Sequence, residues 1–179
     1  MFSIPNLFTL GRLLLAPVVI RAILDGAHGL ALAVFVIAAA SDGIDGALAR
    51  RYHAITLAGA YLDPIADKVL LSGVYLALAL AEFLPWWFVG LIFARDLLIL
   101  AFAAYAFLFT TFRKFQPSGW GKFSTFMQIV TAIAWMARNV LVIGWVDALA
   151  RALIWPTAVA TVWSGLHYGW RGLRNLRTD

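Results

Sequence analysis

The chain has 179 residues, of which 63% are hydrophobic and only 13% are charged, and its mean hydropathy is +0.87. Apolar runs of about 20 residues recur without polar faces, which argues against a soluble protein with an unusually large core. The chain contains no cysteine, which excludes disulfides, thiolate metal sites and a cysteine nucleophile. We therefore expect an integral membrane protein whose chemistry uses oxygen and nitrogen groups.

Apolar segments separated by turn formers or charges predict an all-α, polytopic membrane fold with six transmembrane helices. In chain order the predicted spans are 7–24, 28–51, 57–81, 85–112, 119–143 and 147–168. The first apolar segment resembles the core of a signal peptide, but no basic residue precedes it and Pro17 interrupts it, so we expect a retained helix. Without a repeat or a long linker, the sequence predicts one membrane-embedded domain over residues 1–179.

Basic residues predict the orientation of this domain. One set of predicted loops and ends carries Arg50, Arg51, Arg113, Lys114, Lys122, Arg171, Arg174 and Arg177. The opposite set carries Arg151 alone among basic residues, together with Asp25, Glu82 and Asp147. The positive-inside rule places the first set and both termini in the cytoplasm, beside anionic lipid headgroups. Because these residues flank apolar spans in separate loops, we expect no nucleic-acid partner.

Four of the eight aspartates fall within one stretch, SDGIDGALARRYHAITLAGAYLDPIADKV. Asp42 and Asp45 are three residues apart near the end of the second predicted span. Asp63 and Asp67 are four residues apart early in the third span. These spacings place each pair on one helix face, and the short connection predicts antiparallel neighbours. We therefore expect the four carboxylates to converge below the cytoplasmic surface.

Carboxylates in a membrane need compensating charge. Arg50, Arg51 and Lys68 are near in sequence and could pair with one or two of them. Four are not easily balanced in this way, because each ionised carboxylate at depth costs at least about 2.5 kcal/mol and like charges repel. Two divalent cations would cancel the four charges, and all-oxygen ligands select Mg²⁺ or Mn²⁺. The pattern therefore predicts a dinuclear metal site.

Small residues lie on the same helix faces as these aspartates. Gly46, Ala49 and Gly59 predict a trough between the two helices, which serves either close helix packing or a ligand held against the backbone. Arg50 at its rim can bind a phosphate.

Eight of these positions resemble the signature of the CDP-alcohol phosphotransferase family, D-x2-D-G-x2-A-R-x8-G-x3-D-x3-D. They are Asp42, Asp45, Gly46, Ala49, Arg50, Gly59, Asp63 and Asp67. The six predicted helices are also similar to that family's membrane core. The resemblance implies transfer of a phosphatidyl group from CDP-diacylglycerol to an alcohol, with release of CMP and the use of two metal ions.

Site roles follow from the resemblance, position by position. It implies that Asp42, Asp45, Asp63 and Asp67 bind the metals and that Asp67 is also the base for the acceptor hydroxyl. Gly46, Ala49, Arg50, Thr56 and Gly59 would line the CDP-lipid pocket. The opening SIPNLFTLGR is similar to the family's first helix, where Asn6 and Thr9 would approach the nucleotide. The alternative for these last two is a helix N-cap and a helix-facing hydroxyl.

Two branches of the family share features with IPN, LDPIADK and GKFSTFMQ of this chain. The stretches FARDLLILAFAAYAF and LHYGWRG favour a cardiolipin synthase, which uses phosphatidylglycerol as acceptor. The alternative branch uses glycerol 3-phosphate and makes phosphatidylglycerophosphate. Candidate acceptor-binding residues are Arg95, Lys122 and Arg138. Arg95 can instead pair with Glu82 or Asp96, and Arg138 can pair with a backbone carbonyl or snorkel to the membrane interface.

The resemblance further implies a homodimer, and we expect a bacterial inner membrane protein with its active site on the cytoplasmic side. An ion transporter is the non-enzymatic alternative, because transporters also gather membrane aspartates around a cation path. That alternative predicts an inverted repeat with broken helices, which this short chain does not suggest.

Overall fold

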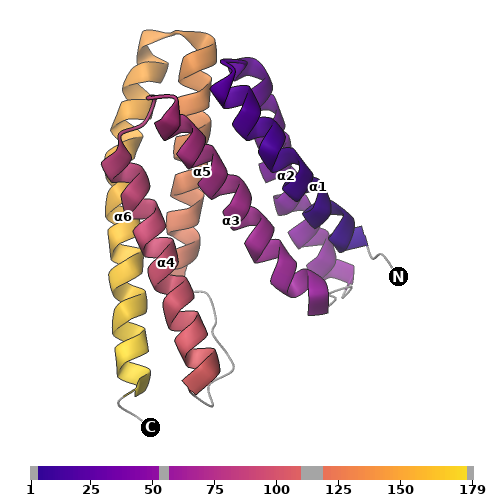
Figure 1. The fold of residues 1–179 in the computed structure, drawn as a ribbon, viewed down its shortest axis with the longest axis vertical. Coiled ribbons are helices and arrows are strands. Elements are labelled where there is room, and N and C mark those ends of the chain that lie inside the picture. The colour runs from indigo at the N-terminus through magenta and orange to yellow at the C-terminus, as the bar shows by residue number, and fades with distance from the viewer. Residues whose placement is uncertain (1–3, 53–56, 110–118, 177–179) are drawn as a thin grey trace. The chain divides into compact units, whose positions relative to one another are not determined.

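Six α-helices form the regular structure of the protein over the parts of the backbone described, 4–52, 57–109 and 119–176 (Figure 1). In this computed structural model, side chains are described for residues 11–41, 66–102 and 119–170. The helices are α1 (Ile4–Leu24), α2 (His28–Tyr52), α3 (Leu57–Leu80), α4 (Trp86–Phe109), α5 (Gly119–Leu141) and α6 (Gly144–Leu176). The predicted all-α class with six helices is confirmed.

The predicted boundaries hold within about three residues except at two places: α6 continues to Leu176, eight residues beyond the predicted end at 168, and the break before α6 is misplaced. The sequence places this break at 144–147, but α6 begins at Gly144 and has Asp147 in its first turn. The break lies at Val142, whose φ of 48° and N–H bond to the Arg138 carbonyl end α5 in a left-handed cap. An acidic residue near a helix N-terminus is favoured by the helix dipole, so Asp147 belongs inside α6 and not in the turn.

A glycine-based cap ends α1. Gly26 has a φ of +74°, and the N–H groups of Gly26 and Ala27 bond back to the carbonyls of Ile23 and Ala22 at 3.2 and 2.8 Å. This bond pair is the Schellman motif, in which a left-handed residue reverses the chain and satisfies the last carbonyls of the helix. The cap explains why α2 begins only four residues after α1 ends.

The chain divides into two compact units. The first unit comprises residues 1–84 and 132–147, and the second comprises residues 85–131 and 148–179. The first therefore contains α1, α2, α3 and the turn between α5 and α6, while the second contains α4, the start of α5 and most of α6. The single domain over residues 1–179 stays a prediction.

In the first unit, α1 packs against both α2 and α3 (Figure 1). The buried side of α1 includes Ala16, Val19 and Ile23, which follow the three- and four-residue spacing of one helix face. The α3 glycine Gly73 permits close packing here, because a Cβ at this position would lie 2.6 Å from Cδ1 of Ile20. The interface thus fixes α3 against α1 in the same unit that carries the four aspartates.

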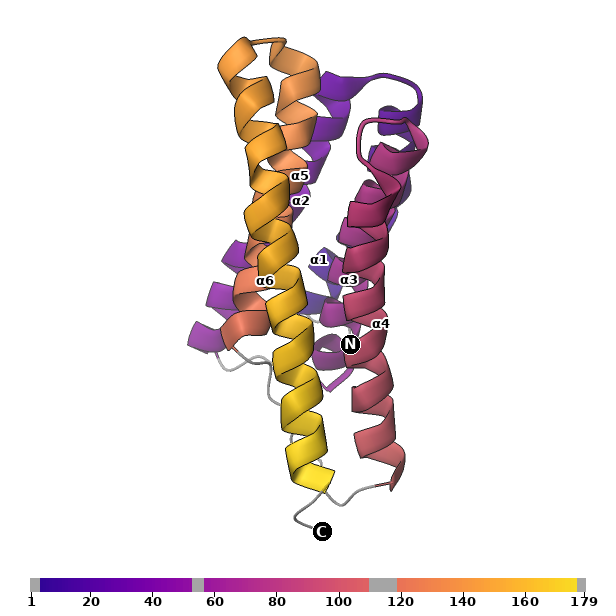
Figure 2. The same ribbon diagram turned by 90° about the vertical axis from the view of Figure 1, so that its left-hand side faces the viewer.

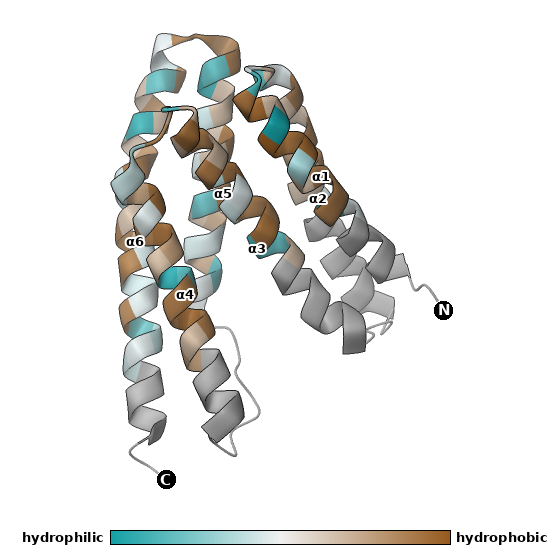
Figure 3. Cartoon of the chain, in the orientation of Figure 1, coloured by the Kyte–Doolittle hydropathy of each residue, from teal (hydrophilic) through white to brown (hydrophobic). Residues whose placement is uncertain are grey.

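In the second unit, α6 lies beside both α4 and α5 (Figure 2), and side-chain hydrogen bonds connect it to each of them. Figure 3 shows hydrophobic residues dominating the described parts of α1, α3 and α4, with more weakly polar positions along α5 and α6. Among the residues described, none of the helices combines the length and the apolar character needed to cross a membrane.

Candidate functional site

The four predicted metal-binding aspartates lie on two helices. Asp42 and Asp45 are on α2, and Asp63 and Asp67 are on α3, so the one-turn spacing within each pair is that of an α-helix. The side chains of Asp42, Asp45 and Asp63 fall outside the described residues, and the convergence of all four carboxylates stays a prediction.

Asp67 has a described side chain, and its carboxylate Oδ1 forms an ion pair with Nη1 of Arg12 on α1. The two partners differ in burial: the Arg12 side chain is 4% exposed, whereas that of Asp67 is 43% exposed. This pair was not predicted from the sequence, because Arg12 and Asp67 are far apart in the chain. One signal was present, since an arginine in the middle of an apolar helix requires a compensating carboxylate, and no acidic residue lies within four positions of Arg12 in the sequence.

The residues predicted to line the CDP-lipid pocket occupy the same three helices. Asn6 and Thr9 are on α1, Gly46, Ala49 and Arg50 are on α2, and Gly59 is on α3, while Thr56 falls outside the described backbone. None of the side chains among them is described. Their assignment to the nucleotide stays a prediction.

The donor set of the predicted metal site suits hard cations. Four carboxylates offer only oxygen, the ligand type preferred by Mg²⁺ and Mn²⁺. Within the described side chains no cluster of three or more His, Cys, Asp or Glu could hold a metal ion. Three of the four predicted ligands lie outside that search, so the aspartates on α2 and α3 remain the candidate site.

Arg95 on α4 is buried in the second unit, with 7% of the residue exposed. Each of its three guanidinium nitrogens donates a hydrogen bond: Nη1 to Asp96 at 2.7 Å, Nη2 to Ser164 at 2.9 Å and to the Gly121 carbonyl at 3.3 Å, and Nε to Ser164 at 3.3 Å. Arg95 therefore ties α4 to α5 and α6. The alternative that it pairs with Asp96 is confirmed.

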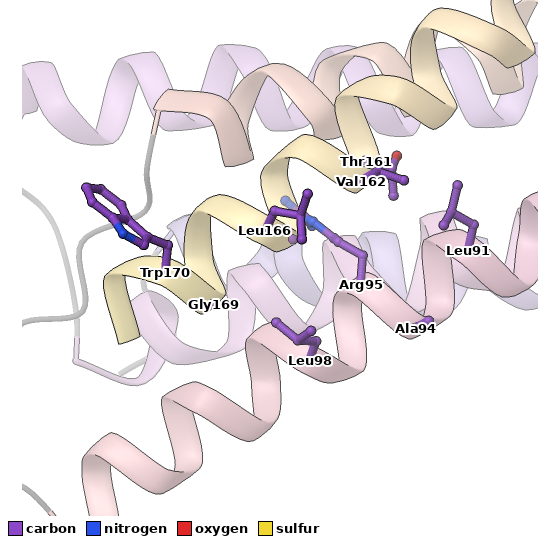
Figure 4. A pocket seen from close by; sticks show the side chains of 10 residues that line it. Leu91, Ala94, Arg95, Leu98, Thr161, Val162, Leu166, Gly169 and Trp170 are labelled. Atoms are coloured by element: carbon purple, nitrogen blue, oxygen red, sulfur yellow. The ribbon is translucent and has the colours of Figure 1, made fainter. Parts of the chain in front are cut away.

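A cavity of about 480 Å³ opens beside Arg95. It lies along α4 and α6, and its lining is largely apolar, with Leu91, Leu98, Val162, Leu166 and Trp170 among the contributors. Figure 4 shows Arg95 reaching from α4 toward α6 close to Leu166. A glycerol phosphate needs several donors around its phosphate. Among the described residues that line this cavity the one charged group is Arg95, which already bonds to protein oxygens.

Six polar side chains line the contact between α5 and α6 in the second unit, and we call this set the polar seam. Its members are Ser124, Gln128 and Thr131 on α5 and Thr157, Thr161 and Ser164 on α6, all of them fully buried. Thr131 and Thr157 share a hydroxyl–hydroxyl hydrogen bond of 2.7 Å. On each helix the members follow at intervals of four and then three residues, the spacing of a helix–helix seam. This pattern was not predicted from the sequence.

The other two predicted acceptor residues differ from Arg95. Lys122 lies in the first turn of α5 and is exposed. Arg138 lies in the last turn of α5, pairs with the Asp147 carboxylate, and stacks 4.7 Å from the ring centre of Trp135. Arg138 thus uses a side-chain carboxylate and not the backbone carbonyl considered from the sequence. Lys122 is the candidate of the three that presents its cation to the surroundings.

Comparison with known proteins tests the family assignment. The family model for CDP-alcohol phosphatidyltransferase matches residues 2–163. A Salmonella typhimurium protein named CDP-diacylglycerol–glycerol-3-phosphate 3-phosphatidyltransferase is 35% identical over 173 residues, which cover 93% of each chain. A Shigella flexneri protein of the same name is 34% identical, also with 93% of each chain covered.

A more distant organism gives a similar result. The Mycobacterium tuberculosis protein named "Probable phosphatidylglycerophosphate synthase" is 34% identical over 182 residues, covering 97% of this chain and 83% of that protein. These names do not support the cardiolipin synthase assignment that the sequence motifs favoured, and they agree with the alternative branch. The local stretches used for that assignment were short, whereas these matches extend over nearly the whole chain. The chain is an enzyme that belongs to the CDP-alcohol phosphatidyltransferase family.

Proposed function

We propose that this enzyme transfers the phosphatidyl group of CDP-diacylglycerol to glycerol 3-phosphate and releases CMP. The observation that carries the proposal is the agreement of relatives from distant bacteria, each named for this reaction or its product and each aligned over most of its length. The Asp-rich signature on α2 and α3 supplies the chemistry that the reaction needs.

The internal contacts of Arg95 remove one argument for a lipid acceptor. The Arg95–Asp96 pair and the apolar stretch after it favoured phosphatidylglycerol in the sequence analysis. In the second unit Arg95 bonds to Asp96 within α4 and also ties α4 to α5 and α6 through Gly121 and Ser164, and Leu98 lines a cavity beside it. These residues therefore have a packing role that is independent of the acceptor.

The proposed catalytic centre is built on the four aspartates. Asp42, Asp45, Asp63 and Asp67 would hold two divalent cations, Mg²⁺ or Mn²⁺, as is general in the family. When bound, such cations stabilise negative charge on the pyrophosphate and on the departing nucleotide. Gly46, Ala49 and Gly59 would leave room for the CDP moiety near the helix backbones, with Arg50, Asn6, Thr9 and Thr56 as polar contacts.

Asp67 is the proposed general base. The hydroxyl oxygen of the acceptor attacks the phosphorus that carries the diacylglycerol, the bond from that phosphorus to the CMP oxygen breaks, and the hydroxyl proton passes to Asp67. The ion pair with Arg12 engages Oδ1 of this carboxylate, and the Asp67 side chain remains 43% exposed. Asp67 is thus both held and accessible.

The acceptor phosphate requires a cation, and Lys122 is the proposed contact because it is exposed at the start of α5. Arg95 and Arg138 already form ion pairs within the protein, and we assign them to structure.

We also propose that the enzyme is embedded in the bacterial inner membrane, with its active site on the cytoplasmic side, and that it acts as a homodimer. Large apolar side chains on its surface support contact with lipid: Leu14, Leu97, Leu100, Trp155, Val159 and Leu166 are each at least 65% exposed. A lipid substrate with two acyl chains also requires access from a bilayer.

CMP release by the purified full-length protein tests the reaction. The assay contains CDP-diacylglycerol and Mg²⁺ with either glycerol 3-phosphate or phosphatidylglycerol. We expect stimulation by glycerol 3-phosphate and a loss of at least 100-fold in Asp67→Asn, since general bases contribute about 10² to 10⁴ in rate. Asp25→Asn is the matched control, because Asp25 is an exposed aspartate in a local pair with Arg21 and should leave the rate unchanged.

Each alternative outcome has a distinct meaning. Stimulation by phosphatidylglycerol alone would restore the cardiolipin synthase branch with the same catalytic centre. Failure of both acceptors would point to another alcohol. Metal transport without CDP-diacylglycerol binding would support the ion transporter alternative.

A further inference from the structure

We propose that Arg12 is a positioning residue for Asp67: its ion pair with Oδ1 orients this carboxylate for the divalent cations that the aspartates would hold. The inference rests on the proposed role of Asp67 in the catalytic centre. It adds a residue of α1 to a site whose four candidate metal ligands are all on α2 and α3.

Arg12 and Asp67 are buried to different degrees. Arg12 is 4% exposed, and its guanidinium reaches the Asp67 carboxylate on the neighbouring helix. A buried cation is held in place by its partner because it cannot be solvated elsewhere. Asp67 remains 43% exposed, so the same contact that fixes its position does not cover it. This arrangement orients a carboxylate for a further ligand.

Arg12 lies on the buried face of α1. Counting forward from Arg12 by four, three and four residues gives Ala16, Val19 and Ile23, all buried. Arg12 thus occupies a core position of the α1 face, where an apolar residue would serve packing equally well. Helix–helix packing alone does not call for a cation here.

A second arginine on α1 provides the contrast. Arg21 forms an ion pair with Asp25, four residues away, at 2.7 Å, and both side chains are at least half exposed. That pair is local and solvated, so it fixes no other helix. Arg12 instead reaches a carboxylate that is 55 positions away in sequence and lies on α3. Arg21→Met is therefore a matched control on the same helix.

The expected consequence concerns metal affinity. Groups that bond to a ligating carboxylate orient it, and their removal typically weakens metal binding or activity by about 10- to 100-fold. Without Arg12 the Asp67 side chain can adopt other rotamers. Metal binding must then fix one rotamer, and this loss of conformational entropy weakens the affinity for the metal. Arg12→Lys retains the charge but loses the planar geometry, so it should recover part of the effect.

Mn²⁺ binding to the purified full-length protein, followed by electron paramagnetic resonance, tests the proposal without turnover. We expect the dissociation constant to rise about tenfold or more in Arg12→Met, less in Arg12→Lys, and not at all in Arg21→Met. In an Asp67→Asn background, Arg12→Met should cause no further change. In CMP-release assays the half-activating Mg²⁺ concentration should rise in parallel with the Mn²⁺ constant.

A purely structural role would lower the unfolding temperature of Arg12→Met but leave Mn²⁺ binding by the folded protein unchanged. Mn²⁺ binding as tight as in the parent, or tighter because Arg12 competes for the carboxylate, would overturn the proposal. If Arg12→Met does not fold, Arg12→Lys and its combination with Asp67→Asn give the same comparison. If Asp67→Asn itself leaves Mn²⁺ binding intact, the proposed catalytic centre fails and not only the role of Arg12.

Discussion

Each of the two compact units buries an arginine, and the two arginines are satisfied in different ways. Arg12 in the first unit pairs with a carboxylate that is 43% exposed. Arg95 in the second unit pairs with a carboxylate that is 16% exposed and also bonds to a buried hydroxyl and a backbone carbonyl. The exposure of the partner separates the roles: the first arginine orients a group that remains accessible, and the second closes a structural cluster.

The polar seam extends this difference. Thr131 and Thr157 bond to each other, and Ser124 lies 3.4 Å from the hydroxyl of Thr161, so these buried hydroxyls find partners within the second unit. Small polar residues in such seams allow two helices to approach closely and bond across the contact. In the second unit these polar groups thus hold the helices together, while the first unit carries the aspartates proposed for chemistry.

Removal of Arg95 should have the largest effect on stability. Arg95→Met removes the hydrogen bonds that the guanidinium donates to Asp96, Ser164 and the Gly121 carbonyl, and breaking a buried pair in this way typically costs about 3–5 kcal/mol. Chemical unfolding in detergent, followed by tryptophan fluorescence, measures the loss. Arg21→Met, at an exposed position on α1 in a local pair with Asp25, is the control and should change stability by less than about 1 kcal/mol.

The same Arg95 variant separates a structural role from acceptor binding. If Arg95 serves structure, the fraction of folded enzyme falls, but the KM for glycerol 3-phosphate of the remaining folded enzyme is unchanged. A large rise in this KM at unchanged stability would instead place Arg95 in the acceptor site and would erase the contrast with Arg12.

A smaller effect is expected within the polar seam. Thr131→Val and Thr157→Val each remove one partner of a 2.7 Å hydrogen bond, and a double-mutant cycle should give a coupling energy of about 1 kcal/mol. Thr125→Val, on the same helix at a half-buried position, is the control for the loss of a hydroxyl outside the polar seam. A coupling energy of zero would mean that the seam contributes packing without hydrogen bonding.

Local sequence patterns predicted the helices and the family well, because apolar runs and the spacing of the aspartates are properties of single segments. The break between the last two helices was misplaced, since it is formed by Val142 in a left-handed conformation, which a β-branched residue rarely adopts. A turn signal based on glycine therefore pointed to Gly144 instead. The polar seam could have been predicted from the sequence, because its members follow the same four- and three-residue spacing on both helices.

The partners of the arginines were harder to predict. Arg12 and Asp67 are far apart in sequence, and only the packing of α1 against α3 brings them together. Arg95 was assigned correctly to Asp96 as one alternative, because the two are adjacent, but its bonds to Gly121 and Ser164 depend on tertiary contacts. Sequence thus identifies a charge that needs compensation more readily than the group that compensates it.

The smallest effect is expected for Arg138. It tests whether the exposure of the carboxylate partner distinguishes a structural arginine from one that serves the active site. Its pair with Asp147 joins the end of α5 to the start of α6, and both side chains are about one-third exposed. Such a pair contributes about 0–1 kcal/mol, so Arg138→Met should lower unfolding stability slightly, and Asp147→Asn should lower it by a similar amount. Neither should alter the KM for glycerol 3-phosphate in the CMP-release assay. If Arg138→Met raises this KM several-fold while Asp147→Asn does not, Arg138 belongs to the acceptor site. An ion pair within this protein would then not be evidence that its arginine has a structural role.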